Sequence, residues 1–265
     1  MLDASTVMEK HFSLDESPTF RMLELDEVES TNNYLRQLDM PDDCRMTLVT
    51  AEYQTGGRGA GTNRWESAKG ENLLFSLRVM PSALPVARMF AISEAAALAV
   101  LYSLEAVSGE TAFTVKWPND IYYGDSKVAG ILIENDLMGS KVKSSVIGIG
   151  INVNQRRFVS DAPNPRSLAD IVGHDVERRS VLEAFMDRIA LSLKQIDEGK
   201  EEALDALHSN YRKHLYRFAE KHKYRDEMGV FCATLIDVEP SGHLVLMADD
   251  GKRRRYEFKE VKYIL

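Results

Sequence analysis

Residues 115–132, VKWPNDIYYGDSKVAGIL, bring lysines and aspartates close together in the chain. The sequence PND at 118–120 predicts a tight turn, because proline fixes φ and Asn and Asp side chains can bond their own backbone. A second turn at 124–126 precedes the β-branched run 128–133, which predicts a buried strand. Lys127 therefore lies at the mouth of a buried strand, where a lysine either reaches solvent or meets a ligand anion. Taken alone, the stretch favours an ordinary hairpin with solvated lysines.

Two further segments carry glycines in unusual positions. Residues 54–65, QTGGRGAGTNRW, combine four glycines with two arginines. Their unhindered backbone amides suit an anion-binding nest, and Arg58 and Arg64 favour that interpretation over a flexible surface loop. The predicted strand 145–153, SVIGIGINV, contains two glycines. Glycine weakens a strand and marks either the close approach of a ligand or backbone, or a bulge that curves the sheet.

Alternating and helical patterns predict the elements that hold these segments. Strands are predicted at 20–28, 46–53, 72–79 and 145–153, and helices at 33–38, 85–107, 180–198 and 201–216. Residues 167–172 are predicted as a short helix or turn. The first helix begins beside Ser30 or Thr31 as its N-cap, and Ser180 forms a predicted capping box with Glu183. The helix at 85–107 has few polar residues and is expected to be buried on most of its circumference.

The composition changes near Lys221, after which short strands alternate with turns. Four or five strands in this span predict a small SH3-like barrel. The basic run 252–255 is interpreted as an exposed strand edge whose charges deter aggregation, with RNA binding as the alternative. We expect an α+β chain with an N-terminal arm or short helix at 1–19, a larger domain at 20–218 and a small β domain at 219–265.

Length and composition argue against several classes of protein. The sequence has 265 residues, a net charge of −8 and 44% hydrophobic residues, which is ordinary for a globular protein and unfavourable for broad nucleic-acid binding. Two cysteines without a CxxC motif argue against structural zinc. The N-terminal residues are polar, and we expect no apolar run long enough to span a bilayer. The expected location is cytoplasmic.

Four segments then occur in a specific order: ESTN at 29–32, QTGGRGAGTNRW at 54–65, KWPND…K…GIL at 116–132 and GIGINVN at 148–154. In this order and spacing the chain resembles the biotin–protein ligases over about residues 20–215, and the C-terminal barrel also fits that family. The resemblance implies the mixed-sheet catalytic fold of the biotin and lipoate ligases. It also implies a two-step reaction, in which the biotin carboxylate attacks the α-phosphate of ATP to give biotinyl-5′-AMP, and a carrier lysine then displaces AMP.

The same resemblance assigns residues to the two substrates. The ureido ring of biotin needs both donors and acceptors, which hydroxyl and amide side chains supply. The residues implied to bind biotin are Ser30, Thr31, Asn32, Gln54, Gly57, Trp65, Gly130 and Gly148. The residues implied to bind the nucleotide are Arg58, Gly59, Ala60, Lys116, Lys127, Gly150 and Asn152, with Ala60 contributing only its backbone amide.

Three residues are implied to carry the chemistry. Lys127 bridges the two anions that must approach each other, and Arg58 clamps the carboxylate and the α-phosphate. Asp120 orients the phosphate lysine or magnesium and helps to deprotonate the incoming amine. Mg²⁺ is expected with ATP, and the sequence does not identify its ligands.

One segment departs from the family pattern. Family members often carry further arginines after the first, as GRGRxGRxW, whereas this chain has GRGAGTNRW. Ala60, Gly61 and Asn63 therefore stand where basic residues often occur. The expected consequence is weaker retention of biotinyl-AMP, detectable as free adenylate in reactions that lack carrier.

The implied acceptor is a biotin carboxyl carrier protein, with no nucleic-acid or membrane partner, and both monomer and homodimer stay open. Because about 19 residues precede the first predicted strand, we expect a monofunctional ligase without the DNA-binding domain of repressor-type members. Two alternatives are a lipoate–protein ligase or related acyltransferase, and a noncatalytic ligand-binding adaptor. The presence of Arg58, Asp120 and Lys127 argues against the adaptor.

Overall fold

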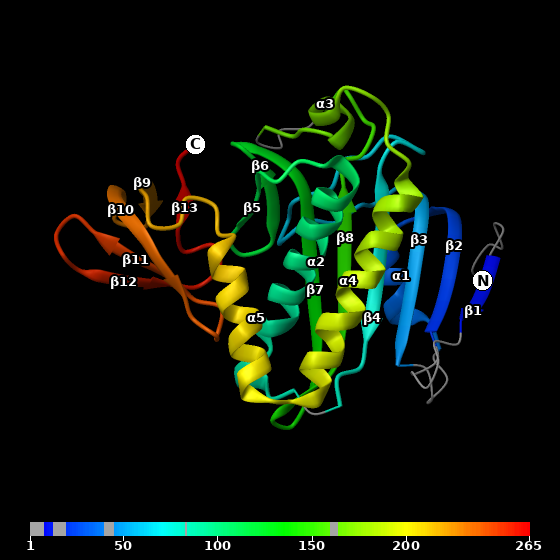
Figure 1. The fold of residues 1–265 in the computed structure, drawn as a ribbon, viewed down its shortest axis with the longest axis horizontal. Helices are drawn as coiled ribbons and strands as arrows, with labels where there is room; N and C mark the ends of the chain where they lie inside the picture. The colour runs from blue at the N-terminus through cyan, green and yellow to red at the C-terminus, as the bar shows by residue number, and fades with distance from the viewer. Residues whose placement is uncertain (1–7, 13–19, 40–44, 83, 160–163) are drawn as a thin grey trace.

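The computed structural model describes the chain except residues 1–7, 13–19, 40–44, 83 and 160–163. Its larger part is an eight-stranded mixed sheet in which β2 and β3 are parallel and the other neighbours are antiparallel (Figure 1). In spatial order the strands are β1 (Met8–Phe12), β2 (Phe20–Val28), β3 (Met46–Gln54), β4 (Leu73–Val79), β8 (Lys141–Ile151), β7 (Ser126–Met138), β6 (Asp120–Tyr123) and β5 (Phe113–Lys116). The predicted mixed-sheet α+β fold is confirmed.

Helices cover both faces of this sheet. They are α1 (Thr31–Gln37), the 3₁₀ turn η1 (Val86–Arg88), α2 (Phe90–Ser108), α3 (Leu168–Val172), α4 (Arg178–Glu198) and α5 (Glu201–Lys213). In Figure 1, α2 and α4 lie side by side across the central strands, and α5 follows at the β5 end. The alanine-rich composition of α2 lets it approach the sheet closely, since an alanine side chain fills little space.

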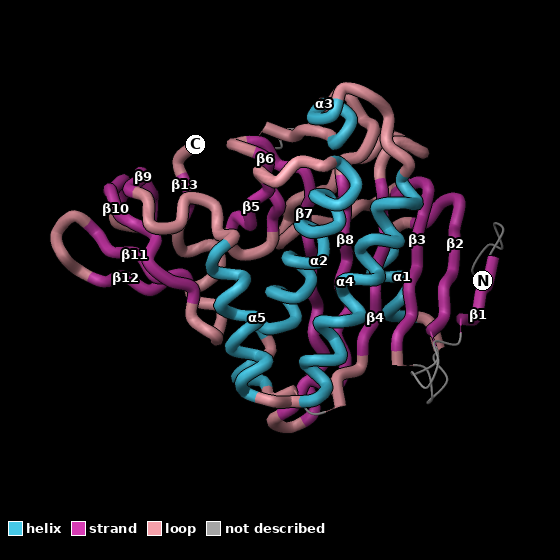
Figure 2. Tube along the Cα trace, viewed as in Figure 1, coloured by secondary structure: helices cyan, strands magenta, loops and turns pink. Residues whose placement is uncertain are grey.

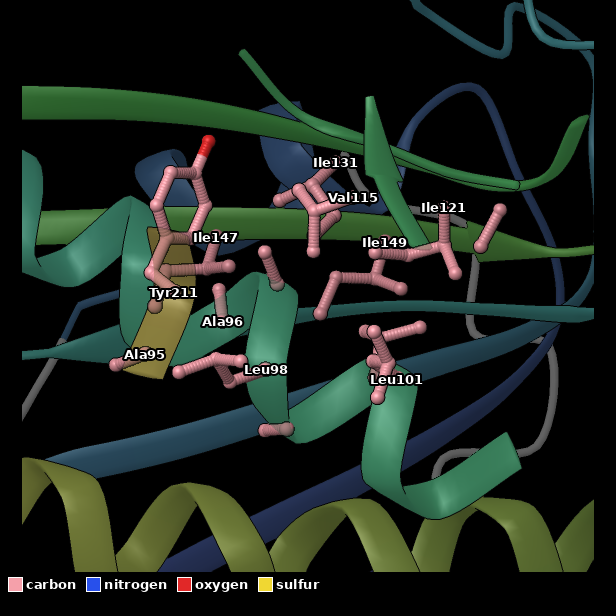
Figure 3. Packing of buried hydrophobic residues seen from close by; sticks show 14 of the residues in the cluster. Ala95, Ala96, Leu98, Leu101, Val115, Ile121, Ile131, Ile147, Ile149 and Tyr211 are labelled. Atoms are coloured by element: carbon pink, nitrogen blue, oxygen red, sulfur yellow. The ribbon is translucent and has the colours of Figure 1, made fainter. Parts of the chain in front are cut away.

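Because side chains alternate along each strand, the two faces of the sheet carry different residues. In β8, Ile147 and Ile149 belong to the main core with α2 (Figure 3), and Ile151 is part of the same core. Successive side chains in a strand point to opposite faces, so Gly148 and Gly150 face away from α2. The same alternation in β4 places Phe75 in the core and turns Ser76 to the other face.

The opposite face is partly covered by α1. Leu35 of α1 packs with Leu23, Val49 and Val146 in a separate apolar cluster. These residues come from β2, β3 and β8, so a short helix closes one end of this face. The rest of the face, over β7 and β8, is left for the cavity described below.

The second sheet is antiparallel and stands beside the β5 end of the larger one (Figure 2). Its strands are β12 (Arg253–Tyr256), β11 (Leu244–Ala248), β10 (Gly229–Val238), β9 (Lys221–Asp226) and β13 (Lys262–Tyr263) in spatial order. Tyr224 and Leu235 join the main hydrophobic core, so the two sheets share one interior. Trp117 also crosses between them, because its Nε1 donates to Gly242 O at 2.8 Å. The five strands agree with the predicted SH3-like domain, and no closed barrel is seen in the described residues.

Most predicted elements are confirmed, and four details were wrong. The described part of the N-terminal arm contains β1, which pairs with β2, instead of a helix or a plain arm. Helix α4 begins at Arg178 after Glu177 as N-cap, so Ser180 lies inside the helix and there is no capping box. The first helix does start after Ser30, but its hydroxyl makes no capping bond. The last helix ends at Lys213, before the predicted residue 216.

A fifth difference concerns apolar length. Residues Val86–Ser108 have the length and mean hydropathy, 1.6, of a membrane-spanning helix, and 67% of the most apolar window is buried inside the protein. Its residues Ala95, Ala96, Leu98 and Leu101 lie within the main core (Figure 3). In the described structure this apolar segment therefore forms the central helix of the hydrophobic core.

Candidate active site

A cavity of about 490 Å³ opens on the sheet face that lies away from α2. Its walls come from the start of α1, the glycine-rich loop, the β5–β6 turn, β7, β8 and the segment after β12. It is lined by Ser30, Thr31, Asn32, Gln54, Arg58, Gly59, Ala60, Asn63, Arg64, Trp65, Lys116, Trp117, Pro118, Asn119, Asp120, Lys127, Gly130, Ile131, Leu132, Gly148, Ile149, Gly150, Phe258, Lys259, Val261, Lys262 and Tyr263. The structure therefore brings together most of the predicted site residues.

Lys127 and Asp120 form the central ion pair of the cavity. Lys127 Nζ lies 2.6 Å from Asp120 Oδ1, and the two side chains are 22% and 25% exposed. Lys127 Nζ also lies 5.6 Å from the ring centroid of Trp65, within the range of a cation–π contact. The backbone of Lys127 is fixed by Asn164 and Arg166, which bond its N and O at 2.8 and 2.9 Å. The side chain thus projects from an anchored strand start.

Three glycines of β7 and β8 leave room for side chains that pack against these strands and form one wall of the cavity. A Cβ at Gly150 would lie 2.7 Å from Trp65 Cζ2, and one at Gly130 would lie 2.9 Å from Trp65 Cζ3. A Cβ at Gly148 would lie 2.8 Å from Asn32 Cγ. The indole therefore packs directly against the strand backbones because side chains are missing there. The close approach predicted from the strand glycines is confirmed, with Trp65 and Asn32 as the approaching side chains.

The α1 end of the cavity is a polar network. Gln54 Oε1 accepts hydrogen bonds from Thr31 N at 2.8 Å and from Thr31 Oγ1 at 3.1 Å. Ser76 Oγ lies 2.7 Å from Thr31 Oγ1 and 2.5 Å from Asn32 Oδ1. Thr31, Asn32 and Ser76 are buried, Gln54 is half-buried, and all four are linked by hydrogen bonds. They therefore hold fixed donor and acceptor directions toward a neutral polar ligand.

Arg58 is held at the cavity edge by Glu134. Its Nη2 lies 3.1 Å from Glu134 Oε1, and its Nη1 donates to Asn33 Oδ1 at 2.7 Å. Partial burial pushes the pKa of Glu134 upward, but hydrogen bonds from Asn32 and Arg58 and the charges of Arg58 and Arg36 bring the pKa below its ordinary value. Glu134 is therefore a persistent anion that positions both Arg58 and Asn32.

Lys116 lies between the two sheets. Its Nζ donates to Tyr122 OH at 2.9 Å and lies 5.3 Å from the ring centroid of Tyr263. Burial lowers the pKa of Lys116 to about 8. The negative charge of Asp120 acts in the opposite direction and raises this pKa, whereas the positive charge of Lys127 lowers it further. At neutral pH the group is charged, in surroundings that make an added anion favourable.

Two predicted residues do not line the cavity. Gly57 lies behind the wall, where a Cβ would meet Trp65 O at 2.7 Å. Asn152 is buried, and its Nδ2 lies 3.4 Å from Lys127 O. Both residues support Trp65 or Lys127 from outside, and their predicted contacts with biotin and adenine stay predictions, as do the roles of the lining residues.

Sequence reasoning missed several contributors. Ser76 lies in a run that was interpreted only as a strand, and Glu134 directly follows the run 128–133. The segment 258–263 joins β12 to β13 and includes β13. Ser76 carries a usable signal, because a lone serine in the apolar run LLFSLRV must find a polar partner when buried. Lys259 and Lys262 carried no such signal.

The donor set indicates how a metal would be held. No group of three or more His, Cys, Asp or Glu residues that could hold a metal occurs in the described part of the chain. Within that part, Asp120 is the single acidic residue lining the cavity. Mg²⁺ in nucleotide sites is commonly bound by one or two carboxylates and the substrate phosphates. The residues therefore fit Mg²⁺ that enters with ATP and is held through its phosphates and Asp120.

Comparison with known proteins agrees with this geometry. The model of the Biotin/lipoate A/B protein ligase family matches residues 25–152. The bifunctional ligase/repressor BirA of Bacillus spizizenii is 34% identical over 166 residues, which are 61% of this chain and 50% of that protein. The biotin--[acetyl-CoA-carboxylase] ligase of Paracoccus denitrificans is 32% identical over 156 residues, which are 56% of this chain and 63% of that protein.

A solved structure extends the likeness beyond the matched segment. The biotin protein ligase from Aquifex aeolicus in complex with biotin and ATP has a TM-score of 0.75 and 26% identity, over 92% of this chain and 99% of that one. By contrast, this chain spans only 50% and 63% of the two curated relatives. Residues 25–152 are therefore similar to the Biotin/lipoate A/B protein ligase family, and the likeness of fold extends over most of the chain.

Proposed function

We propose that this chain is an ATP-dependent ligase that joins biotin to a lysine of a biotin carboxyl carrier protein through biotinyl-5′-AMP. The observation that carries the proposal is the Lys127–Asp120 pair at 2.6 Å, set beside Trp65 in a strongly cationic cavity. Among the described residues, six lysines and arginines line that cavity against one carboxylate. A chain with a net charge of −8 has therefore concentrated positive charge at one cavity, as a polyanionic substrate requires.

In the first step, a carboxylate oxygen of biotin attacks the α-phosphorus of ATP, the bond to the bridging oxygen breaks, and pyrophosphate leaves. Two anions must meet, so the cost of the step is largely electrostatic. Lys127 offsets the charge that accumulates at the α-phosphate. Arg58 exchanges its contact with Glu134 for the substrate anions, and its planar fork suits the carboxylate.

In the second step, the amine of the carrier lysine attacks the acyl carbon, and the bond to the phosphate oxygen breaks to release AMP. Asp120 takes the proton of the amine, since it is the carboxylate that lines the cavity in the described structure. The indole of Trp65, packed against Gly150, keeps the apolar side of the cavity dry. Exclusion of water matters because an acyl adenylate hydrolyses.

Release of pyrophosphate tests the first step. The purified chain is incubated with MgATP and either biotin or lipoate. We expect release with biotin and little with lipoate. Release with lipoate alone supports the lipoate–protein ligase alternative, and release with neither supports the noncatalytic adaptor; either result overturns the proposal.

The acceptor and the location are part of the same proposal. Transfer of biotin to a carrier domain, lost when the acceptor lysine is changed to arginine, tests the carrier protein as partner. For the location we propose the cytoplasm, where proteins rarely depend on disulfides, and this chain has only two cysteines. Fractionation of cells followed by immunoblotting tests the location, and recovery in the membrane fraction would contradict it.

A further inference from the structure

The two lysines that the larger sheet contributes to the cavity have different partners. Lys127 Nζ lies 2.6 Å from Asp120 Oδ1, so a carboxylate compensates its charge. Lys116 Nζ instead donates to the hydroxyl oxygen of Tyr122 at 2.9 Å and lies 4.6 Å from the centroid of the same ring. A phenol oxygen accepts a hydrogen bond without adding negative charge. The ammonium group of Lys116 is therefore held in place while its charge stays available to an anion.

The pairing of β5 with β6 explains why Lys116 meets Tyr122. Lys116 pairs in register with Asp120, and Tyr122 follows two residues later in β6. Because successive side chains of a strand alternate between faces, Tyr122 lies on the same face as Lys116. Tyr122 is fully buried, and its ring packs on that of Tyr216 with the centroids 5.3 Å apart. This packing fixes the hydroxyl group and, through it, the place of the ammonium group.

Burial gives this hydrogen bond a second consequence, for the protonation of Lys116. Burial lowers the pKa of Lys116 to about 8, because it separates the charged form from water. Burial also raises the pKa of Tyr122 well above its ordinary value, so the hydroxyl group stays neutral wherever the lysine is charged. A hydrogen bond from a charged donor is stronger than one between neutral groups. Tyr122 therefore favours the ammonium form of Lys116 over the free amine.

The other charges near Lys116 are paired with each other. Asp120 pairs with Lys127, and Arg217 Nη2 lies 3.6 Å from Asp125 Oδ1. The negative member of each pair raises the pKa of Lys116, and the positive member lowers it. Each pair carries no net charge, which leaves the Tyr122 hydroxyl group as the hydrogen-bonding partner of the ammonium group. The titratable groups around Lys116 and Tyr122 come from β6, the β6–β7 turn, β7, the segment after α5 and β13, and are Asp120, Tyr122, Asp125, Lys127, Tyr216, Arg217 and Tyr263.

We propose that Tyr122 is a positioning residue for Lys116, whose ammonium group it holds beside the cavity and keeps charged for the phosphates of the nucleotide. This role rests on the proposed binding of ATP in the cavity, and it is independent of which acid is activated. Tyr122 lies outside the lining of the cavity and acts through Lys116 alone. Removal of its hydroxyl group is therefore expected to weaken nucleotide binding, to move the pH dependence of that binding, and to leave biotin affinity unchanged.

Calorimetric titration of the full chain with α,β-methylene-ATP and Mg²⁺, in the presence of biotin, measures nucleotide binding without loss of pyrophosphate. The titration is repeated at pH values on both sides of about 8, the pKa of Lys116, to find the pH at which affinity falls. Tyr122→Phe keeps the ring and is expected to weaken binding at neutral pH by roughly 2- to 10-fold, the loss of one hydrogen bond. The fall in affinity is expected at lower pH than in the wild type, because the charged form of Lys116 has lost its acceptor.

The matched control is Tyr216→Phe. It removes the hydroxyl group of the neighbouring tyrosine, which donates to Asp125 and makes no hydrogen bond to Lys116 in the described structure. Both the affinity for the nucleotide and the pH at which that affinity falls are expected to match the wild type.

Lys116→Met separates a positioning role from a packing role. Affinity is expected to be low in this variant, and adding Tyr122→Phe is expected to change it no further. A wild-type pH dependence in Tyr122→Phe overturns the inference, as does an equal loss when Tyr122→Phe is added to Lys116→Met. If biotin elicits no pyrophosphate but Tyr122→Phe still moves the pH dependence, the ligase proposal fails while the assignment of Tyr122 stands. Absence of nucleotide binding in the wild type overturns both.

Discussion

Asp120 Oδ1 lies 2.6 Å from Lys127 Nζ, although the two residues belong to different strands of the β6–β7 hairpin. Asp120 pairs in register with Gly130, so Lys127 extends along the hairpin to reach it. The missing side chain at Gly130 leaves room for this path, since a Cβ there would lie 3.2 Å from Lys127 Nζ. The pair therefore holds the lysine in place before any substrate arrives, which lowers the entropic cost of catalysis.

Lys127→Ala is expected to reduce biotin-dependent pyrophosphate release by about 100- to 1,000-fold, the usual effect of removing one group that stabilises developing charge. Biotin affinity, measured by calorimetry, is expected to stay within a few-fold of the wild type. Lys194→Ala, an exposed change in α4, provides the control. Near-normal turnover of Lys127→Ala would remove its assigned role.

The lowered pKa of Lys116 leads us to expect that kcat/KM for ATP depends on pH. Burial lowers the pKa of Lys116 to about 8, so the ammonium is present below that pH and lost above it. Because the charged form attracts phosphate, kcat/KM for ATP is expected to fall as the pH rises through about 8. Lys116→Arg stays charged and is expected to move this fall to higher pH. Identical pH profiles for the two proteins would contradict the assignment.

Gly150→Ala tests the wall of the cavity. The new Cβ would lie 2.7 Å from Trp65 Cζ2, so the indole must move away from β8. Overpacking of this kind costs about 1–3 kcal/mol, and we expect biotin affinity to fall by roughly tenfold or more. Lys143→Ala, an exposed change in the same strand, is expected to bind biotin normally. Unchanged affinity in Gly150→Ala would show that biotin does not depend on the position of Trp65.

The sequence predicts the close packing against Gly148 and Gly150, but it does not predict the polar contacts of Glu134 beside them. Gly148 and Gly150 are recognisable because glycine is unfavourable in a strand, so its presence points to close approach. Glu134 gives no such signal, since its partner Asn32 is 102 residues away and the contact exists only after β7 and α1 meet. Local patterns report backbone preference, whereas the charge partners of a site depend on tertiary packing.

The same limit applies to the second sheet. Its strands were predictable from alternation and turns, and the basic run does lie on the edge strand β12, as predicted. The pairing of its arginines with Glu239 and Asp226 was not predicted. That Lys259 lies against Gly61 was not predictable, because no pattern in either segment specifies which sheet edge faces the cavity. The site residues of the larger sheet could thus be recognised from the sequence, whereas those of the second sheet could not.

Glu94 and His208 give a prediction for stability, away from the cavity. Glu94 Oε1 lies 2.6 Å from His208 Nδ1 between α2 and α5, and the two side chains are only 3% and 13% exposed. Glu94→Leu leaves the imidazole buried without its partner, so the free energy of unfolding is expected to fall by about 1–3 kcal/mol. Glu94→Gln keeps an acceptor and is expected to cost less. Urea denaturation followed by circular dichroism measures the free energy of unfolding of both variants. The control is Glu202→Ala, an exposed change in α5. If Glu94→Leu is as stable as the wild type, the Glu94–His208 pair does not support the packing of α5 on α2.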